Sequence, residues 1–183
     1  MKVEAIIEVL NWEIRFAMIT NKKMSLFDAP KDAPIVHACN SQGVWQSGIA
    51  KAFKDNYPYS YKDYNNFCKR ANQERGSACG RGAFSTFHES EKHWVGWLIT
   101  SHNYGDLKDS PELIKINTTM ALIEVCKLIY MAHPDEDFPS IDVYSNKFNS
   151  GLFGVPWADS ELILKTILKD FRRINWIICD PEV

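Results

Sequence analysis

The chain has 183 residues, of which 45% are hydrophobic and 24% are charged, a composition typical of one compact globular domain. Its formal net charge is only -2, so no overall electrostatic attraction draws it to nucleic acid or to an anionic membrane surface. We therefore expect one domain over residues 1–183, with no membrane segment, no strong nucleic-acid binding, and residues 1–11 as a possible N-terminal extension.

The hydrophobic pattern predicts strands that alternate with helices. In chain order, the predicted elements are a helix at 3–10, strands at 12–20 and 35–38, helices at 49–57 and 59–70, strands at 83–87 and 94–101, a helix at 111–131, a strand at 141–144, a helix at 160–171 and a strand at 174–179. Such alternation predicts a three-layer α/β/α fold around a central mixed sheet. The polar link between the strands at 83–87 and 94–101 suggests that His88 and His93 are exposed.

The cysteines indicate a reducing compartment rather than a disulfide framework. Their number is odd, they are scattered, and no two of them form a CxxC pair: Cys39, Cys68, Cys79, Cys126 and Cys179. This spacing argues against disulfides and against a structural zinc site. We expect a cytoplasmic protein that works as a monomer, without a metal or cofactor.

Two junctions between a strand and a helix have the chemistry of anion-binding loops. Gly43 and Gly48 flank VWQS in the first, and Gly151 and Gly154 flank LF in the second. Such junctions bring unpaired backbone N–H groups together, and glycine lets the backbone approach a ligand closely. Neither loop contains a lysine or arginine, and neither has the GK[ST] ending of a P-loop or the GxGxxG pattern. Ordinary turns remain the alternative interpretation of both loops.

Polar residues near the first loop are candidates for proton transfer. His37 comes at the end of a predicted strand, close to Asn40, and an imidazole with its usual pKa of roughly 6.5 suits acid–base chemistry. A half-buried histidine bonded to the backbone is the alternative. Asp106 and Asp109 follow the central apolar strand, where helix capping or simple solvation is the alternative to catalysis.

The segments HACNSQGVWQSGIA and NSGLFGVPW together resemble the macro domain family, and within it the ADP-ribose 1''-phosphate phosphatases. The resemblance to that branch lies in His37, in the Gly-x-Trp segment at 43–45 and in the FGVPW segment at 153–157. It covers nearly the whole chain from Thr20 onward.

This resemblance implies that the two loops hold the diphosphate and distal ribose of an ADP-ribose-like ligand, with Asn40 near that ribose and Trp45 beside it. It also implies metal-independent removal of the terminal phosphate by His37, as nucleophile or acid–base catalyst, and by an aspartate. We prefer Asp106 in that role and keep Asp109 in reserve. The implied ligand-binding residues are Leu26, Phe27, Asn40, Gly43, Val44, Trp45, Ser47, Gly48, Ile49, Ala50, Ser150, Gly151, Leu152, Phe153, Gly154 and Val155.

The sequence leaves some alternatives open. Where family members often carry an acidic residue that contacts adenine, this chain has Ser25, so adenine recognition is weaker or falls to Asp28. Two other macro domain activities compete with the phosphatase: hydrolysis of ADP-ribosyl esters or of ADP-ribosylated macromolecules, and ADP-ribose binding without catalysis. The histidine and the FGVPW segment favour the phosphatase, because a binding module needs neither.

Overall fold

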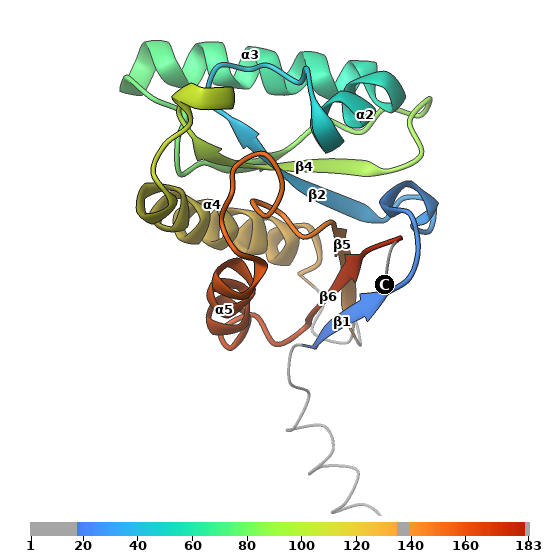
Figure 1. Ribbon diagram of the computed structural model, residues 1–183. Coiled ribbons are helices and arrows are strands. Elements are labelled where there is room, and N and C mark those ends of the chain that lie inside the picture. Colours follow the sequence, from blue (N-terminus) through green and yellow to red (C-terminus); the bar gives the residue numbers. More distant parts are fainter. Residues whose placement is uncertain (1–17, 135–139, 182–183) are drawn as a thin grey trace, which may run out of the picture.

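The computed structural model describes residues 18–134 and 140–181, which form a mixed sheet of six strands (Figure 1). The strands are β1 (Ile19–Lys22), β2 (Pro34–Asn40), β3 (Gly82–Phe84), β4 (Trp94–Ser101), β5 (Ile141–Ser145) and β6 (Ile174–Cys179). Their order across the sheet is β1-β6-β5-β2-β4-β3, and only β3 runs antiparallel to its neighbour. The mixed sheet confirms the predicted fold class.

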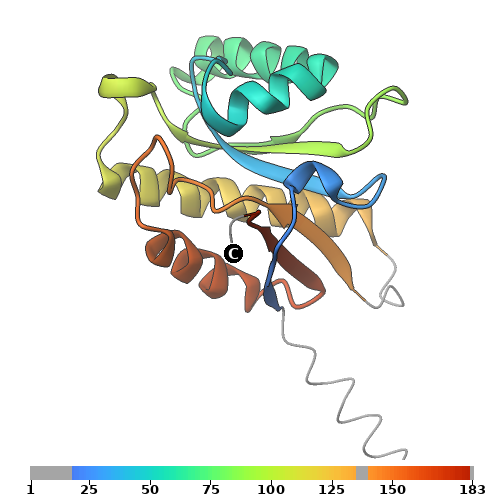
Figure 2. The same ribbon diagram turned by 45° about the vertical axis from the view of Figure 1, so that its right-hand side comes forward.

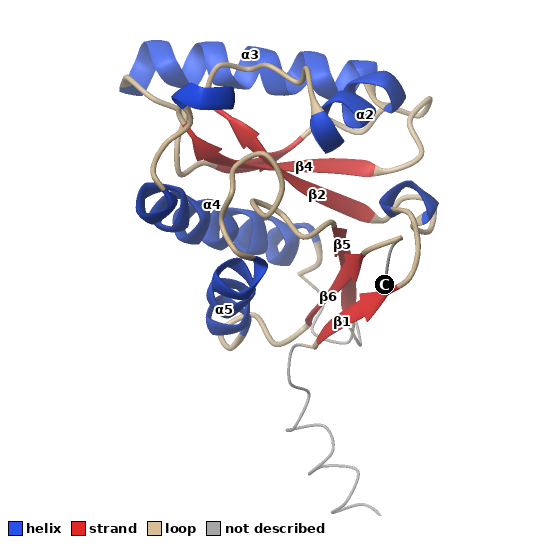
Figure 3. Ribbon diagram, viewed as in Figure 1, coloured by secondary structure: helices blue, strands red, loops and turns tan. Residues whose placement is uncertain are grey.

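Helices cover both faces of this sheet (Figures 1 and 3). On one face lie α2 (Gly48–Asn56) and α3 (Pro58–Arg75), and on the other lie α4 (Pro111–Ala132) and α5 (Trp157–Leu168). Alternate residues of β2 serve the two layers, because Ile35 packs with the α2 and α3 side chains and Val36 with those of α4 and α5. No described helix is both long enough and apolar enough to span a membrane.

The predicted and observed elements agree best where the sequence is most apolar. Strands β4 and β6 have the predicted bounds, whereas α3 continues to Arg75 and α5 spans Trp157–Leu168 rather than 160–171. Helix α3 ends at Gly76, whose φ of 78° is the left-handed conformation that glycine adopts easily. The predicted helix at 3–10 and most of the predicted strand at 12–20 lie outside the described residues.

His93 is buried, so the prediction that it is exposed is wrong. Its Nδ1 lies 2.5 Å from the Tyr57 hydroxyl, and its Nε2 lies 2.8 Å from the carbonyl oxygen of Ala29. Since a carbonyl only accepts, Nε2 carries the ring proton and Nδ1 accepts from the hydroxyl. Burial lowers the pKa of His93. His88 is half-buried, with Nε2 lying 3.2 Å from the Asp63 carboxylate.

The parallel strands place their carboxyl ends along one edge of the sheet. Strands β2, β4, β5 and β6 end there, and the loops that follow them meet at that edge (Figure 2). One of these loops contains the 3-10 helix η2 (Gly105–Leu107), while a second 3-10 helix, η1 (Leu26–Asp28), precedes β2. In open α/β sheets this edge is where ligands bind, which directs attention to the loops.

Candidate functional site

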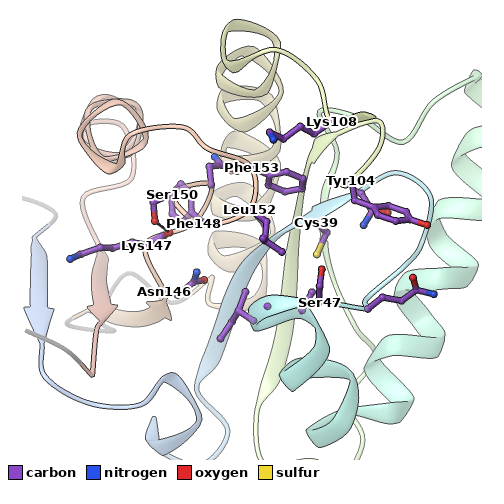
Figure 4. A pocket seen from close by; sticks show the side chains of 18 of the residues that line it. Cys39, Ser47, Tyr104, Lys108, Asn146, Lys147, Phe148, Ser150, Leu152 and Phe153 are labelled. Atoms are coloured by element: carbon purple, nitrogen blue, oxygen red, sulfur yellow. Dashed lines mark hydrogen bonds between the residues drawn. The ribbon is translucent and has the colours of Figure 1, made fainter. Parts of the chain in front are cut away.

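A pocket of about 790 Å³ opens at the carboxyl edge of the sheet (Figure 4). Its walls come from the loops after β2, β4, β5 and β6 and from the start of α2. Predicted site residues that line it are Asn40, Val44, Ser47, Gly48, Ile49, Ala50, Asp106, Ser150, Gly151, Leu152 and Phe153. Those that lie outside its lining are Leu26, Phe27, His37, Gly43, Trp45, Gly154 and Val155. The structure thus brings the two predicted loops together at one cavity.

Asn40 organises the first loop through its side-chain amide. Its Nδ2 donates to the Val44 carbonyl at 2.7 Å, and its Oδ1 accepts from the backbone N–H groups of Gln42 at 3.0 Å and Val44 at 3.3 Å. The Asn40 carbonyl accepts from the Tyr64 hydroxyl. Because the amide is bonded within the loop, the main contribution of Asn40 is to fix the shape of the wall that faces the ligand.

Gly43 packs against α3 instead of facing the pocket, which differs from its predicted role. It is buried with a φ of 72°, and its carbonyl accepts from Asn65 Nδ2 at 2.9 Å. A Cβ at this position would lie 3.0 Å from that same Nδ2 and 3.3 Å from Cys68 Cβ. Glycine is required here for a tight turn beneath the loop, not for backbone access to a ligand.

The first turn of α2 directs unpaired N–H groups at the pocket. Gly48, with a φ of 55°, begins the helix, and the first backbone bond of that turn runs from Lys51 N–H to the Ser47 carbonyl. Within the described chain, the N–H groups of Gly48, Ile49 and Ala50 therefore have no acceptor. Such a helix start attracts an anion through these donors and through the positive end of the helix dipole.

The second loop offers a matching set of donors and touches the first loop. Among the described residues, no acceptor bonds to the N–H groups of residues 151–153, whereas Gly154 N–H bonds to the Gly151 carbonyl at 2.9 Å. Leu152 Cδ1 would lie 3.4 Å from a Cβ built on Gly48. The two sets of free donors therefore flank the same cavity, an arrangement that can bind an anion such as a phosphate group.

Asn149 anchors the second loop, a role that the sequence did not indicate. Its Oδ1 accepts from Thr100 Oγ1 at 2.9 Å, and its Nδ2 donates to Thr118 Oγ1 at 2.9 Å. Its carbonyl accepts from the buried Val155 N–H at 3.0 Å, although its φ of 65° is unusual for a residue other than glycine. Val155 thus closes the loop on Asn149, whose side chain ties the loop to β4 and α4.

The structure does not bring His37 to the pocket. Its side chain is completely buried, its ring stacks on Phe53 at 3.8 Å, and its two nitrogens lie 3.5 and 3.6 Å from Cys39 Sγ. Burial lowers the pKa of His37 to about 3, so the imidazole is neutral at pH 7. His37 does not line the cavity, which differs from the place that its predicted catalytic role requires.

Trp45 also belongs to the core rather than to the wall of the pocket. It is fully buried, its Nε1 donates to Cys39 Sγ at 3.2 Å, and its ring stacks on Tyr64 at 4.8 Å. The Trp45 and His37 rings pack edge to face, with 4.6 Å between their centroids. The aromatic residue of the first motif therefore packs behind the loop and does not line the cavity, which differs from its predicted place beside the ribose.

Leu26 and Phe27 pack into the core on the α2 side. Leu26 is buried, while Phe27 contacts the Phe53 ring at 5.2 Å, and Ser25 Oγ accepts from the Phe27 N–H at 3.3 Å. The far end of the pocket is instead lined by residues 179–181, which are the last residue of β6 and the two that follow it. The rule that ligands bind beyond the carboxyl ends of strands would have indicated that segment.

The two candidate aspartates differ in their position relative to the pocket, although Asp106 in η2 is only three residues before Asp109. Asp106 is exposed and lines the pocket, whereas Asp109 lies outside the lining. The Asp109 carboxylate accepts from the backbone N–H of His102 at 2.9 Å and lies 2.7 Å from Nδ1 of that residue. Of the two, only Asp106 lines the cavity, and Asp109 holds His102.

Lys108 and Tyr104 also line this end of the pocket, and sequence reasoning missed both. Lys108 lies against the second loop, since its Cε would be 3.8 Å from a Cβ on Gly154 (Figure 4). No carboxylate in residues 18–134 or 140–181 pairs with its ammonium group. Lys108 therefore provides a free positive charge next to Asp106.

Comparisons with known proteins identify the family of this chain. The macro domain family model matches residues 36–164. A protein of Aspergillus clavatus named ADP-ribose 1''-phosphate phosphatase is 33% identical over 176 residues, covering 80% of this chain and 88% of its own. One of the same name from Aspergillus oryzae is also 33% identical, covering 80% and 87%. The chain belongs to the macro domain family.

Solved structures share the fold at lower identity. The macrodomain of Mycobacterium tuberculosis DarG has a TM-score of 0.70 and 21% identity, covering 90% of this chain and 99% of its own. Thermosipho africanus DarTG, solved in complex with ADP-ribose, has a TM-score of 0.66 and 15% identity, covering 92% of this chain and 43% of its own. At these identities, the likeness shows the fold alone.

Proposed function

We propose that this protein is an ADP-ribose 1''-phosphate phosphatase that converts its substrate to ADP-ribose and inorganic phosphate. One observation carries the proposal: unpaired N–H groups of Gly48–Ala50 and of residues 151–153 flank one cavity at the carboxyl edge of a macro domain sheet. The name shared by the Aspergillus relatives, at 33% identity over most of both chains, supports the choice of reaction.

In this proposal, the diphosphate lies between the two loops. The N–H donors of α2 and of the second loop bind its oxygens, and Asn40 keeps the first loop in shape beside the distal ribose. The terminal phosphate then points toward η2, where Asp106 and Lys108 line the cavity. The adenosine extends toward residues 179–181 at the opposite end.

The chemical step is hydrolysis of a phosphate monoester. A water molecule attacks phosphorus, the bond between phosphorus and the ribose 1'' oxygen breaks, and that oxygen leaves with the electron pair and gains a proton. Asp106 orients the water and accepts a proton from it, while the Lys108 ammonium balances the negative charge on the phosphate. Positioning of the substrate by the two loops supplies much of the acceleration.

A substrate panel tests the proposal against its two competitors. The full chain is incubated separately with ADP-ribose 1''-phosphate, O-acetyl-ADP-ribose and an ADP-ribosylated protein, and the products are separated by chromatography. We expect rapid release of phosphate from the first compound and much slower cleavage of the other two. Faster cleavage of either ester would favour an ADP-ribosyl hydrolase, and ADP-ribose binding with no turnover would indicate a reader.

The proposal extends to the setting in which the enzyme acts. The cysteine pattern supports a protein of the reducing cytoplasm, and the low net charge argues against strong nucleic-acid binding. We propose that it acts there as a monomer on a small molecule. Light scattering of the purified chain would test the monomer, and a mass that corresponds to a dimer would contradict it.

A further inference from the structure

A second cluster of chemically active side chains lies outside the pocket lining. Cys79, His102 and Asp109 each offer a ligand atom, and these atoms all lie within 4.8 Å of one another. The three side chains are half-buried, and they come from separate segments: the turn before β3, the end of β4 and the residues just before α4. We propose that these three side chains bind a zinc ion.

The backbone holds the cluster in place from several sides. The turn that carries Cys79 is fixed by Ala78 N–H donating to Asn72 Oδ1 at 2.8 Å and by Gly80 N–H donating to the Ile99 carbonyl at 2.8 Å. These bonds join the turn to α3 and to β4. The thiol therefore sits on a fixed element rather than on a free loop, as a metal ligand requires.

His102 and Asp109 are held in the same way. The His102 carbonyl accepts from Ser41 Oγ at 3.1 Å and from Gln42 Nε2 at 3.0 Å. The Asp109 N–H donates to Ser101 Oγ at 3.0 Å, and its carboxylate bonds to the His102 N–H at 2.9 Å. The His102 Nδ1 also lies 2.7 Å from the Asp109 carboxylate, so the two candidate ligands already face each other. A zinc ion bound between them would replace that contact, while the backbone bonds keep the loop in place.

The donor set selects the metal. One thiolate, one imidazole and one carboxylate suit Zn²⁺, whereas Mg²⁺ and Ca²⁺ prefer oxygen ligands alone. Ligand atoms of a tetrahedral zinc ion lie roughly 3.3 to 3.6 Å apart, given bond lengths of about 2.0 to 2.3 Å, so small side-chain movements complete the site. The thiol gives up its proton to solvent as the sulfur–zinc bond forms, and water takes the fourth position.

The zinc ion would fasten both ends of the segment that carries Asp106. His102 begins this segment and Asp109 ends it, while Tyr104, Asp106 and Lys108 between them line the pocket. The ion itself stays outside that lining and takes no part in the proposed phosphate chemistry. Ligand spacing in the chain gave no indication of the site, because the three residues meet only after the sheet has formed.

Metal titration of the full, reduced chain tests the site. After treatment with a chelator, the protein is titrated with Zn²⁺ in competition with a chromophoric chelator, and with Co²⁺ as a spectroscopic probe. We expect one ion per chain and a thiolate-to-cobalt charge-transfer band. Cys79→Ser, His102→Gln and Asp109→Asn should each weaken Zn²⁺ binding by at least about tenfold. The matched control is His88→Gln. His88 also lies beside an aspartate, Asp63, but it is not one of the three proposed ligands, so its replacement should leave Zn²⁺ binding unchanged.

Alkylation keeps the proposal testable if a variant fails to fold. Cys79 is half-buried and the other four cysteines are buried, so a maleimide should modify Cys79 first in the native chain. Bound Zn²⁺ should slow that modification by at least about tenfold, as read by mass spectrometry of the peptides, because a coordinated thiolate is shielded. Absence of stoichiometric binding, a cobalt complex without the thiolate band, unchanged affinity in Cys79→Ser, or alkylation that ignores Zn²⁺ would each overturn the site.

Discussion

The imidazole of His37 stacks on the Phe53 ring with 3.8 Å between centroids and 11° between planes, entirely inside the α2 layer of the core. The sequence places this histidine in the motif that most resembles a phosphatase, yet the structure uses it as a core residue. Both ring nitrogens face Cys39 Sγ. His37→Phe should therefore retain phosphate release in the folded fraction, measured as turnover per folded molecule, and loss of that turnover with normal folding would contradict this placement.

The same histidine makes the free energy of unfolding depend on pH. Burial lowers its pKa to about 3 in the folded protein, so between pH 6.5 and pH 3 the unfolded chain binds a proton that the folded protein excludes. The contribution of His37 to the free energy of unfolding is therefore complete above pH 6.5. It declines as the pH falls, by up to about 1.4 kcal/mol per pH unit.

Urea unfolding at pH 7, 6 and 5 should accordingly show a shallower loss of stability in His37→Phe than in the wild type. His93, whose pKa is also lowered by burial, is present in both proteins and contributes equally. Because slopes are compared, any uniform destabilisation by the larger ring cancels. Equal slopes would mean that His37 is not a buried neutral group.

Asp106 should be the residue on which turnover depends most strongly. Asp106→Asn removes the proton acceptor without changing the shape of the side chain, so phosphate release should fall by about 10²- to 10⁴-fold. ADP-ribose affinity, measured by calorimetry, should be largely unchanged, because the loops that bind the diphosphate are intact. Full activity in this variant would exclude Asp106 as the general base and would leave Asp109 as the candidate aspartate.

Lys108 should distinguish the phosphorylated substrate from the product. Lys108→Met removes the free positive charge near the terminal phosphate, and kcat/KM for ADP-ribose 1''-phosphate should fall about tenfold, or ~1.4 kcal/mol. ADP-ribose lacks that phosphate, so its affinity should change little. Lys165→Met, which removes a lysine paired with Glu161 on α5, is the control and should behave as the wild type. An equal loss of affinity for both ligands would place Lys108 at the diphosphate instead.

Gly43 and Gly151 should respond differently to the same substitution. Gly43→Ala forces a side chain into a left-handed turn against Asn65 and should cost about 1 to 3 kcal/mol in the free energy of unfolding. Around Gly151, no atom lies within 4 Å of an added Cβ, so Gly151→Ala should stay within about 0.5 kcal/mol of the wild type. Denaturant titration measures both, and similar values would contradict the packing assigned to Gly43.

The fold was predictable because its signals are local. The almost wholly apolar run at 94–101 and the Ser110 cap before Pro111 each specify one element, and β4 and α4 begin where these signals place them. The pairing of the two glycine loops at one cavity also followed, because both loops come after parallel strands.

The missed features depend on contacts between distant segments. Residues of a central strand are buried on both faces, so the sequence alone cannot show whether His37 points toward the core or toward a ligand. The Glu91 carboxylate accepts from the backbone N–H of Tyr59 at 2.8 Å and caps α3 from a distant part of the chain, a contact that the sequence did not indicate. Lys108 and residues 179–181 become pocket residues only when the sheet brings their loops together.

Phosphate release from ADP-ribose 1''-phosphate tests the central claim most directly. The full chain is mixed with this compound, and inorganic phosphate and ADP-ribose are quantified over time, with Asp106→Asn as the reference and added ADP-ribose as a competitor. We predict that phosphate and ADP-ribose form in equal amounts and that ADP-ribose inhibits the reaction by occupying the same pocket. The proposed phosphatase activity would be contradicted if the wild-type chain binds ADP-ribose but releases phosphate no faster than Asp106→Asn.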